Sequence, residues 1–186
     1  MNICVFGASS SDIDTEYILQ AEILGRKMAQ QGHTLVFGGG ATGLMGAVAD
    51  GIKKEKGKLI GVSPEFFNKP GILDQECTEF IWTKTMRERK QIMEERSDAI
   101  VVLPGGIGTY EEFMEMLTLK QLGQTRKPII LYNICGYYDI MEQLLKHTAQ
   151  KGFMDAECLK LCRVSSDPDE VLELIKLNED FNLIKW

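Results

Sequence analysis

The sequence predicts an α/β fold in which helices cover both faces of a doubly wound, mainly parallel sheet. Short apolar runs rich in β-branched residues alternate with longer amphipathic segments along the 186 residues, and this order requires crossover connections between parallel strands. The runs are almost wholly apolar, as expected for strands that helices bury on both faces. With no internal repeat and no linker, residues 1–186 are expected to form a single domain.

Each expected strand is an apolar run bounded by glycine, proline or polar residues. In chain order, the strands are expected at residues 2–7 (NICVFG), 33–37 (HTLVF), 58–62 (KLIGV), 79–83 (EFIWT), 98–103 (DAIVVL), 128–132 (PIILY) and 162–165 (CRVS). Residues 63–78 hold two prolines and a glycine. We expect them to form a long loop of the kind that often makes a lid or rim.

The segments between the strands have helical periodicity or helix end signals. Helices are expected at residues 13–31, 43–56, 85–96, 109–122 and 137–151, with a last helix after residue 166. The first carries Leu24 and Met28 four residues apart, on the spacing of one helix face. The second ends in lysines, which suit the negative end of the helix dipole. The last begins with Asp167 and Pro168, a favourable N-cap and first-turn pair.

Composition excludes several classes of partner. The net charge of −6 argues against a nucleic-acid surface, which is normally basic, but a few backbone amides can still hold a small anion. No apolar run is long enough to span a membrane, and the start lacks a basic leader with a cleavage site, so we expect a cytoplasmic protein without a membrane partner. The five scattered cysteines are expected to be free thiols. With two histidines in the chain, we expect no metal site and no cofactor.

Three strand-to-helix junctions are rich in glycine and hydroxyl residues: residues 7–11, 38–43 and 104–109. In doubly wound sheets, ligands bind beyond the carboxyl ends of the strands. Glycine lets backbone N–H groups face a ligand, and the helix start adds positive partial charge. Each junction therefore predicts a candidate phosphate cradle.

The second junction matches the dinucleotide fingerprint G-x-G-x-x-G at Gly38, Gly40 and Gly43, with Glu65 about 20 residues further on. This pattern favours an NAD-linked oxidoreductase as one alternative. The fingerprint normally occupies the first strand–helix turn, however, and here it occupies the second. Glycines at this place also permit a tight turn and close helix–sheet packing. The sequence contains no Walker-type phosphate loop.

The third junction is more specific, because it reads P-G-G-x-G-T-x-x-E from Pro104 to Glu112. It places glycine amides and the Thr109 hydroxyl at a helix start. Thr109 and Glu112 are three residues apart and share a helix face. An anion on the glycines would therefore lie beside the carboxylate. The alternative is that Glu112 only caps the helix or interacts with its dipole.

This loop resembles the signature of the Lonely guy (LOG) family, the cytokinin riboside 5′-monophosphate phosphoribohydrolases often mislabelled lysine decarboxylases. The sequence MRERK, which ends in Arg89 and Lys90, resembles the family's M-H-x-R-K element, and GGGATGLMG at 38–46 resembles its glycine-rich segment. The motifs occur in the family's order from the first strand to the helix after Pro128. The resemblance implies a Rossmann-like sheet and homodimers or larger assemblies with active sites beside the subunit interface.

By this resemblance, Arg89 and Glu112 match the family's catalytic residues. The residues expected to bind substrate are Ser9, Gly39, Gly40, Lys90, Gly105, Gly106, Gly108, Thr109, Glu111 and Thr118. Two departures leave the base preference open. Arg87 replaces the family's histidine, and Gly71 lies about where an upstream glutamate is usual.

The predicted reaction is hydrolysis of the N-glycosidic bond of a purine nucleoside 5′-monophosphate, of the cytokinin type or AMP itself, to free base and ribose 5-phosphate. Glu112 would stabilise an oxocarbenium-like sugar and orient the attacking water. Arg89 would act by charge and position, because an arginine does not readily give up a proton. A carrier of nucleotides or pterin cofactors is the alternative, since it would use the same loops without needing Glu112. Nothing in the sequence suggests a pyridoxal phosphate site.

Overall fold

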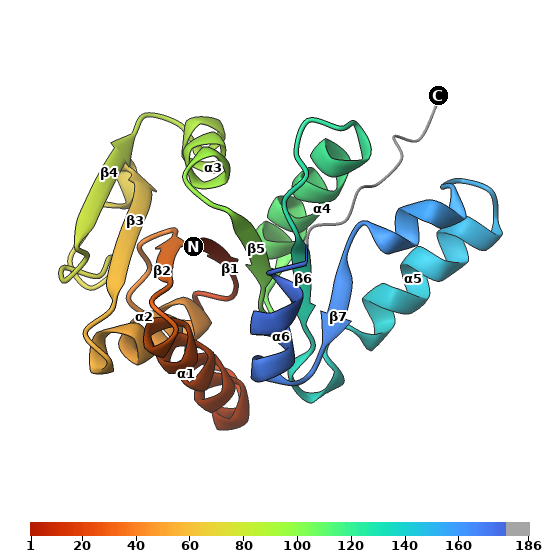
Figure 1. The fold of residues 1–186 in the computed structure, drawn as a ribbon. Helices are drawn as coiled ribbons and strands as arrows, with labels where there is room; N and C mark the ends of the chain where they lie inside the picture. The colour runs from red at the N-terminus through yellow and green to blue at the C-terminus, as the bar shows by residue number, and fades with distance from the viewer. Residues whose placement is uncertain (178–186) are drawn as a thin grey trace.

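The reversal of strand order at the centre of the sheet determines where this protein can bind a ligand. The computed structural model describes residues 1–177, and in them a parallel sheet has the order β4-β3-β2-β1-β5-β6-β7 (Figure 1). The chain runs outward from β1 to β4, returns to β5 on the other side of β1, and continues to β7. The predicted doubly wound parallel fold is confirmed, and its switch point lies between β1 and β5.

The strands and helices lie within a few residues of their predicted positions. The strands are β1 (Asn2–Phe6), β2 (Thr34–Phe37), β3 (Lys58–Pro64), β4 (Glu79–Thr83), β5 (Ala99–Val102), β6 (Ile129–Tyr132) and β7 (Arg163–Ser165). The helices are α1 (Thr15–Gln30), α2 (Gly43–Lys54), α3 (Met86–Glu95), α4 (Ile107–Gln121), α5 (Asp139–Gln150) and α6 (Pro168–Leu174). In the last of these, Asp167 accepts hydrogen bonds from two first-turn amides, which confirms the predicted cap.

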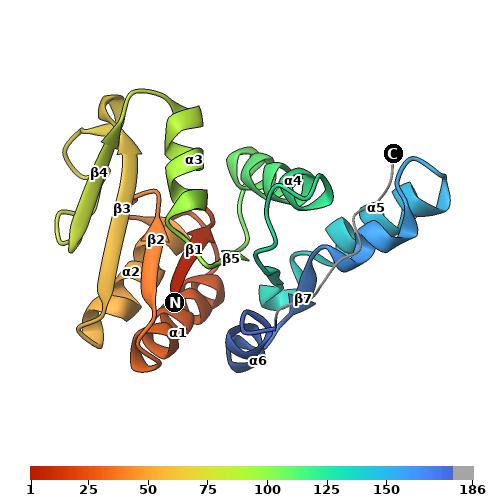
Figure 2. The same ribbon diagram turned by 45° about the horizontal axis from the view of Figure 1, so that its top comes forward.

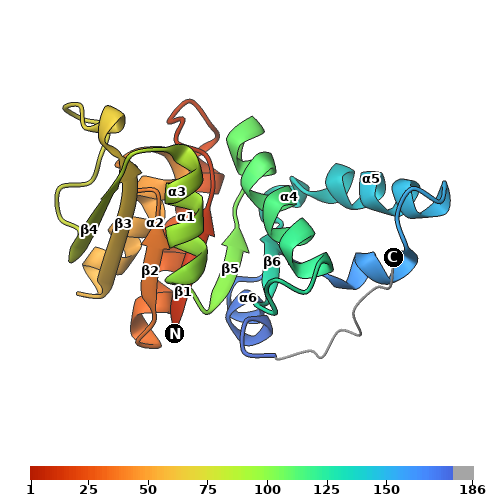
Figure 3. The same ribbon diagram turned by 90° about the horizontal axis from the view of Figure 1, so that it is seen from above.

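Helices cover both faces of the sheet, as Figures 2 and 3 show. Alternate strand residues therefore enter two separate cores: Ile3 and Val5 pack with α1, α2 and α6, whereas Cys4 and Phe6 pack with α3 and α4. This two-sided burial explains why the strands are apolar throughout. Helix α5 extends beyond β7 (Figure 3), and none of its twelve residues is buried.

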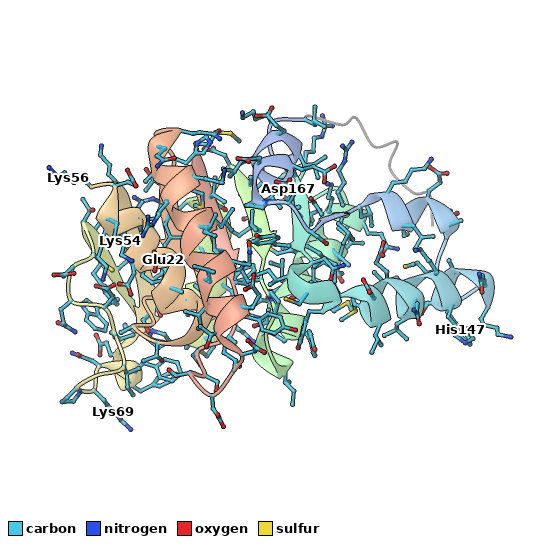
Figure 4. All side chains as sticks on the ribbon, turned by 90° about the horizontal axis from the view of Figure 1, so that it is seen from below. Glu22, Lys54, Lys56, Lys69, His147 and Asp167 are labelled. Atoms are coloured by element: carbon cyan, nitrogen blue, oxygen red, sulfur yellow. The ribbon has the colours of Figure 1, made fainter. Side chains whose placement is uncertain are left out.

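Helices α1 and α2 pack unusually closely because glycines line their contact. A Cβ atom at Gly25 would lie 2.2 Å from the carbonyl oxygen of Val48, and one at Gly51 would lie 2.2 Å from that of Glu22. At the edge of the contact, the Glu22 carboxylate pairs with Lys54 at 2.7 Å (Figure 4). This packing fixes the start of α2 beside the turn after β1.

The segment between β3 and β4 was predicted to be an open loop, and this is only partly correct. Strand β3 continues to Pro64, and a short 3-10 helix follows at Glu65–Phe67. Further on, Leu73 forms a bridge with Gly40, and the buried Asp74 accepts a hydrogen bond from Lys53 at 2.8 Å. A backbone bridge to the turn after β2 and a side-chain bond to α2 thus hold one end of the segment in place.

Within residues 1–177, no helix is both long and apolar enough to cross a membrane.

Candidate active site

A cleft of about 620 Å³ lies over the carboxyl ends of the strands around the switch point. Its walls come from the turns after β1 and β2, the end of β3, the segment 67–73, Arg89 of α3 and the first turn of α4. Segments distant in the sequence thus meet at the edge where a doubly wound sheet binds its ligands.

Arg89 and Glu112 face each other in this cleft, as the sequence motifs predicted. The Nη2 atom of Arg89 lies 3.4 Å from Oε1 of Glu112, and their side chains are 15% and 10% exposed. The Arg89 Nε also donates a hydrogen bond to the carbonyl oxygen of Val62 at 3.3 Å. The bond to β3 therefore fixes one side of the guanidinium, and its Nη2 atom faces the Glu112 carboxylate.

Local sequence at the start of α3 determines where Arg89 points. Thr85 caps the helix by accepting a hydrogen bond from the Glu88 amide at 3.1 Å. The Glu88 carboxylate in turn accepts one from the Lys84 amide at 2.7 Å. This arrangement resembles a capping box, except that the Glu88 carboxylate reaches the amide before the N-cap and not that of the N-cap itself. It places Arg89 one turn inside the helix, on the face toward the sheet.

Gly38 gives the Arg89 guanidinium the space it occupies. A Cβ atom at this position would lie 2.1 Å from Nη2 of Arg89, a separation that no pair of non-bonded atoms can keep. The first glycine of the predicted dinucleotide fingerprint is thus required by an arginine of another helix. Nothing in the spacing of the motif indicates this role.

Burial sets the acidity of Glu112. The residue is 8% exposed, and its removal from water raises the pKa of the carboxyl from 4.5 to about 7, with the Arg89 charge acting in the opposite direction. Desolvation of this kind disfavours the charged form. Glu112 can therefore gain or lose a proton close to neutral pH.

The start of α4 offers unoccupied hydrogen-bond donors next to this pair. The helix begins at Ile107, two residues before its predicted start, with Gly106 as its N-cap. In residues 1–177, the amides of Gly106, Ile107, Gly108 and Thr109 have no acceptor, and the first intrahelical bond of α4 runs from the Tyr110 amide to the Gly106 carbonyl. Open amides at a helix start form an anion site.

The predicted cradle residues take different places around this turn. Gly106 and Gly108 line the cleft, as does the buried Thr109. Gly105 lies behind them, and a Cβ atom there would lie 2.1 Å from the Thr109 hydroxyl oxygen. Ser9 lines the cleft from the turn after β1.

At the second glycine junction, two amides of the first turn of α2 are already used. The amides of Leu44 and Met45 both donate to the carbonyl oxygen of Ala8, at 2.9 and 3.3 Å. Gly43 has a φ of +63° and lies too close to the 8–10 backbone for any side chain. With these two amides occupied, the start of α2 has fewer donors for a pyrophosphate than the start of α4. This junction packs α2 against the β1–α1 turn, as expected if its glycines serve close packing and not a dinucleotide. It gives the NAD hypothesis no support.

Three of the expected binding residues line a second surface and not the cleft. Lys90, Glu111 and Thr118 line a separate groove between α3 and α4, which shares only Phe6 and Glu112 with the cleft. In this groove, the Lys90 ammonium pairs with Glu111 and with Glu115. The Thr118 hydroxyl donates to the carbonyl oxygen of Met114 at 2.8 Å.

Of the other residues that the family resemblance singled out, Gly39 lies on neither of these two surfaces. Gly40 lines the cleft, whereas Gly39 packs under Phe80 with a φ of +74° and is absent from the cleft wall. Arg87, which stands where the family has histidine, lines the groove. Gly71 belongs to the cleft wall.

The sequence predicted residues 63–78 as a long loop of the kind that makes a lid or rim, but it singled out none of the residues that form the far wall of the cleft. Phe67, Ile72 and Leu73 form it together with Ser63 at the end of β3. The Ser63 hydroxyl is buried and has no hydrogen-bond partner among the described residues. A buried hydroxyl usually has a partner, so this one can serve a ligand. The aromatic residues of an expected loop were the only available signal.

Within residues 1–177, no group of three or more histidine, cysteine, aspartate or glutamate side chains is placed to hold a metal ion. All five cysteines are free thiols, as predicted.

Comparison with known proteins matches residues 45–175 to the family model described as possible lysine decarboxylase. A cytokinin riboside 5′-monophosphate phosphoribohydrolase of Arabidopsis thaliana, LOG2, is 32% identical over 94% of this chain and 82% of its own length. The enzyme of that name from Rhodococcoides fascians is 38% identical over 82% of this chain and 78% of its own.

Among solved structures, the molybdenum cofactor binding protein of Rippkaea orientalis superposes with a TM-score of 0.73 and 26% identity, over 94% of both chains. The Moco carrier protein of Chlamydomonas reinhardtii superposes with a TM-score of 0.71, 26% identity and the same coverage.

Proposed function

The chain belongs to the Lonely guy (LOG) family, whose family model is described as possible lysine decarboxylase and whose relatives here are named phosphoribohydrolases. From this premise we propose that the chain hydrolyses the N-glycosidic bond of a purine nucleoside 5′-monophosphate. The products are free base and ribose 5-phosphate. The observation that carries the proposal is the buried Arg89–Glu112 pair, 3.4 Å apart, beside the open amides of α4. Together they offer a phosphate site and a charge pair within the reach of one nucleotide.

The 5′-phosphate binds at the start of α4. Four consecutive amides lack a protein acceptor there, and hydrogen bonds from amides to a charged oxygen are stronger than neutral ones. The phosphate is remote from the bond that breaks. Its binding energy therefore serves to hold the ribose in a reactive position.

Glu112 acts on the sugar. It lies on α4 one turn beyond the phosphate amides, so that the carboxylate reaches the ribose of a nucleotide bound there. As the glycosidic bond breaks, positive charge develops on the sugar, and the carboxylate stabilises it while orienting the attacking water. Arg89 contributes fixed positive charge and hydrogen-bond donors for the ribose hydroxyls or the departing base.

The base lies toward β3. The far wall of the cleft combines apolar side chains, among them Phe67 and Ile72, with the unpartnered Ser63 hydroxyl. A flat purine suits such a wall, because its faces are apolar and its edge carries hydrogen-bonding groups. Both AMP and cytokinin nucleotides meet this description.

The test is hydrolysis of AMP and of isopentenyladenosine monophosphate, followed by chromatography of the released base. Both nucleotides should yield free base, whereas adenosine, which lacks the phosphate, should react far more slowly. Release of phosphate without base, or equal rates with adenosine and AMP, would contradict the proposal.

A cofactor carrier is the second candidate, because two solved structures of similar fold are named for binding the molybdenum cofactor. A carrier would hold a phosphate on the same amides but would need neither Glu112 nor turnover. Tight binding of a nucleotide or pterin without base release, unchanged in Glu112→Gln, would favour this candidate.

The rate should depend on pH through Glu112. The carboxylate form is the active one, and burial raises the pKa of this group to about 7. The kcat for AMP should therefore rise as the pH increases through about 7 and then level off. The phosphate of the substrate also titrates near pH 6, so kcat at saturating AMP is the quantity to measure. A flat profile between pH 5 and 9 would contradict this assignment.

We propose that the protein is a homodimer whose interface includes α5. No residue of α5 is buried within the described chain, and its Leu144 and the nearby Phe153 are 53% and 87% exposed. Figure 4 shows α5 at the side of the molecule, with His147 at its far end. A second copy of the chain would cover this apolar face.

Leu144→Glu should convert the dimer to a monomer of 20.9 kDa, since a charge in an apolar interface is unfavourable. Light scattering after size exclusion measures the mass. Leu19→Glu is the matched control, because Leu19 is similarly exposed, at 49%, but lies on α1. A wild-type monomer, or a Leu144→Glu dimer, would refute the proposed interface.

We also propose a cytoplasmic location, because five free thiols suit a reducing compartment. Cell fractionation tests this location.

A further inference from the structure

Three tyrosines lie behind the turn that joins β5 to α4, which we call the 103–109 turn. The Tyr137 hydroxyl donates a 2.6 Å hydrogen bond to the carbonyl oxygen of Gly105. The Tyr138 hydroxyl donates one of 2.6 Å to the carbonyl oxygen of Leu103. The hydroxyl oxygens of Tyr110 and Tyr137 are themselves 2.6 Å apart. None of these tyrosines lines the cleft, so they contact the turn from its protein side.

The hydroxyl protons of this group have one consistent arrangement. A carbonyl oxygen can only accept, so Tyr137 uses its single proton on Gly105. The bond between the two tyrosines must then run from Tyr110 to Tyr137. Burial raises the pKa of Tyr137 to about 12, which keeps the donor protonated. Tyr110 therefore polarises Tyr137, and the bond to Gly105 is strengthened.

Each carbonyl oxygen of residues 103–106 accepts a hydrogen bond from another group of the protein. The donors to these oxygens are Tyr138 for Leu103, the Ala8 amide for Pro104, Tyr137 for Gly105 and the Tyr110 amide for Gly106. The amides of Gly106 through Thr109 have no acceptor in residues 1–177. The turn thus directs its oxygens into the protein and leaves its N–H groups available.

The Gly105–Gly106 peptide depends most on such an anchor. In a trans peptide, the C=O and N–H groups point in opposite directions. Holding the Gly105 oxygen toward Tyr137 therefore directs the Gly106 N–H toward the cleft. Because glycine flanks this peptide on both sides, no side chain resists a rotation of the whole unit. A rotated peptide would present an oxygen where an anion binds.

We propose that Tyr137 is a positioning residue of the phosphate site: its hydroxyl, supported by Tyr110, keeps the Gly105–Gly106 peptide turned so that the Gly106 amide faces the 5′-phosphate. This inference rests on the proposed function, which places the phosphate at the start of α4. Tyr137 is itself held in place, because its ring contacts those of Tyr17 and Tyr138 edge-on, at centroid distances of 6.2 and 5.1 Å.

Tyr137→Phe tests the proposal, because it removes the hydroxyl and keeps the ring. Its affinity for ribose 5-phosphate, measured by calorimetry, should fall about tenfold, as expected for a single hydrogen bond to a charged group. The KM for AMP should rise by a similar factor, whereas kcat should change less than about twofold, because the lost contact binds substrate and transition state alike. Tyr110→Phe should cause a smaller loss of the same kind.

Tyr132→Phe is the matched control. The Tyr132 hydroxyl is also partly buried and donates to Oε1 of Gln20 at 3.0 Å, so its partner lies on α1 and not in the 103–109 turn. Its removal should leave the affinity for ribose 5-phosphate unchanged. Equal losses of affinity in Tyr132→Phe and Tyr137→Phe would indicate an unspecific loss of packing in the protein and would overturn the proposal.

The outcomes separate this inference from the proposed function. If the wild-type protein binds ribose 5-phosphate and Tyr137→Phe binds it equally well, the inference is wrong and the hydrolase stands. If the wild-type protein binds ribose 5-phosphate but does not cleave AMP, the hydrolase is wrong, and the affinity of Tyr137→Phe still decides the inference. A wild-type protein that does not bind ribose 5-phosphate overturns the inference, whereas release of base from AMP still decides the hydrolase.

Discussion

Glu112→Gln should lower kcat/KM for AMP by about 10³-fold, within the range that a positioned acid–base group contributes to catalysis. Glutamine keeps the size of the side chain and a hydrogen-bond acceptor for Arg89, which lies 3.4 Å away. It cannot carry the negative charge that stabilises the sugar cation. The affinity for ribose 5-phosphate should persist, because the phosphate amides belong to the preceding turn. Steady-state kinetics and calorimetry measure the two effects.

The same substitution should make the folded protein more stable at pH 8. In the folded protein the pKa of Glu112 is raised from 4.5 to about 7, so the folded state binds more protons than the unfolded chain between these values. Stability therefore falls as the pH rises through this window. Glutamine avoids the cost of burying a charge, which for this shift is roughly 3 kcal/mol above pH 7. The difference in unfolding free energy should vanish near pH 4.

Urea unfolding at both pH values measures this gain, and Glu173→Gln provides the control. Glu173 is an exposed glutamate whose carboxylate pairs with Lys176 on the surface, so its replacement should change neither stability nor rate. If Glu112→Gln kept full activity, Glu112 could not be the catalytic carboxylate. If it were less stable than the wild type at pH 8, the buried charge would not carry the expected cost.

Gly38→Ala should reduce kcat/KM for AMP by about 10²-fold, although Gly38 carries no chemical group. The added methyl would lie 2.1 Å from Nη2 of Arg89. The obstacle is the end of a flexible side chain, so the guanidinium can move away and the fold should persist. Its displacement separates the positive charge from Glu112, and misplacement by about 1 Å is enough for a loss of this size.

A double-mutant cycle distinguishes this indirect effect from damage to the turn after β2. If Gly38→Ala acts only through the guanidinium, it should have little further effect on activity in an Arg89→Ala background. Additive losses would show that the alanine disturbs the cleft in another way. Circular dichroism should show the same helix and strand content for all three variants.

The sequence was sufficient to predict the order of the strands and helices, because each strand is buried on both faces and each helix has a periodic apolar face. It also predicted that Arg89 and Glu112 act together, since both lie in recognisable motifs. The start of α4 was placed two residues late, because glycines at 106 and 108 disfavour a helix by propensity alone. Here Gly106 is the N-cap and Gly108 lies in the first turn, where glycine is tolerated.

Other features depend on contacts between distant segments. The requirement for Gly38 comes from an arginine fifty-one positions further along the chain. The separation of Lys90 and Thr118 from the cleft follows from how α3 and α4 face each other. The ordering of the segment after β3 depends on a lysine of α2 that binds Asp74. No local pattern contains this information.

Under the proposed function, the reversal of strand order divides recognition of the nucleotide between two halves of the chain. Residues before β5 would form the wall that faces the base, whereas the turn after β5 would hold the phosphate. Substitutions in the first half should therefore change the preference for the base without changing the binding of the phosphate. Relatives in sequence are named as phosphoribohydrolases, whereas solved structures of similar fold are named for binding the molybdenum cofactor, which is the variation that such a division permits.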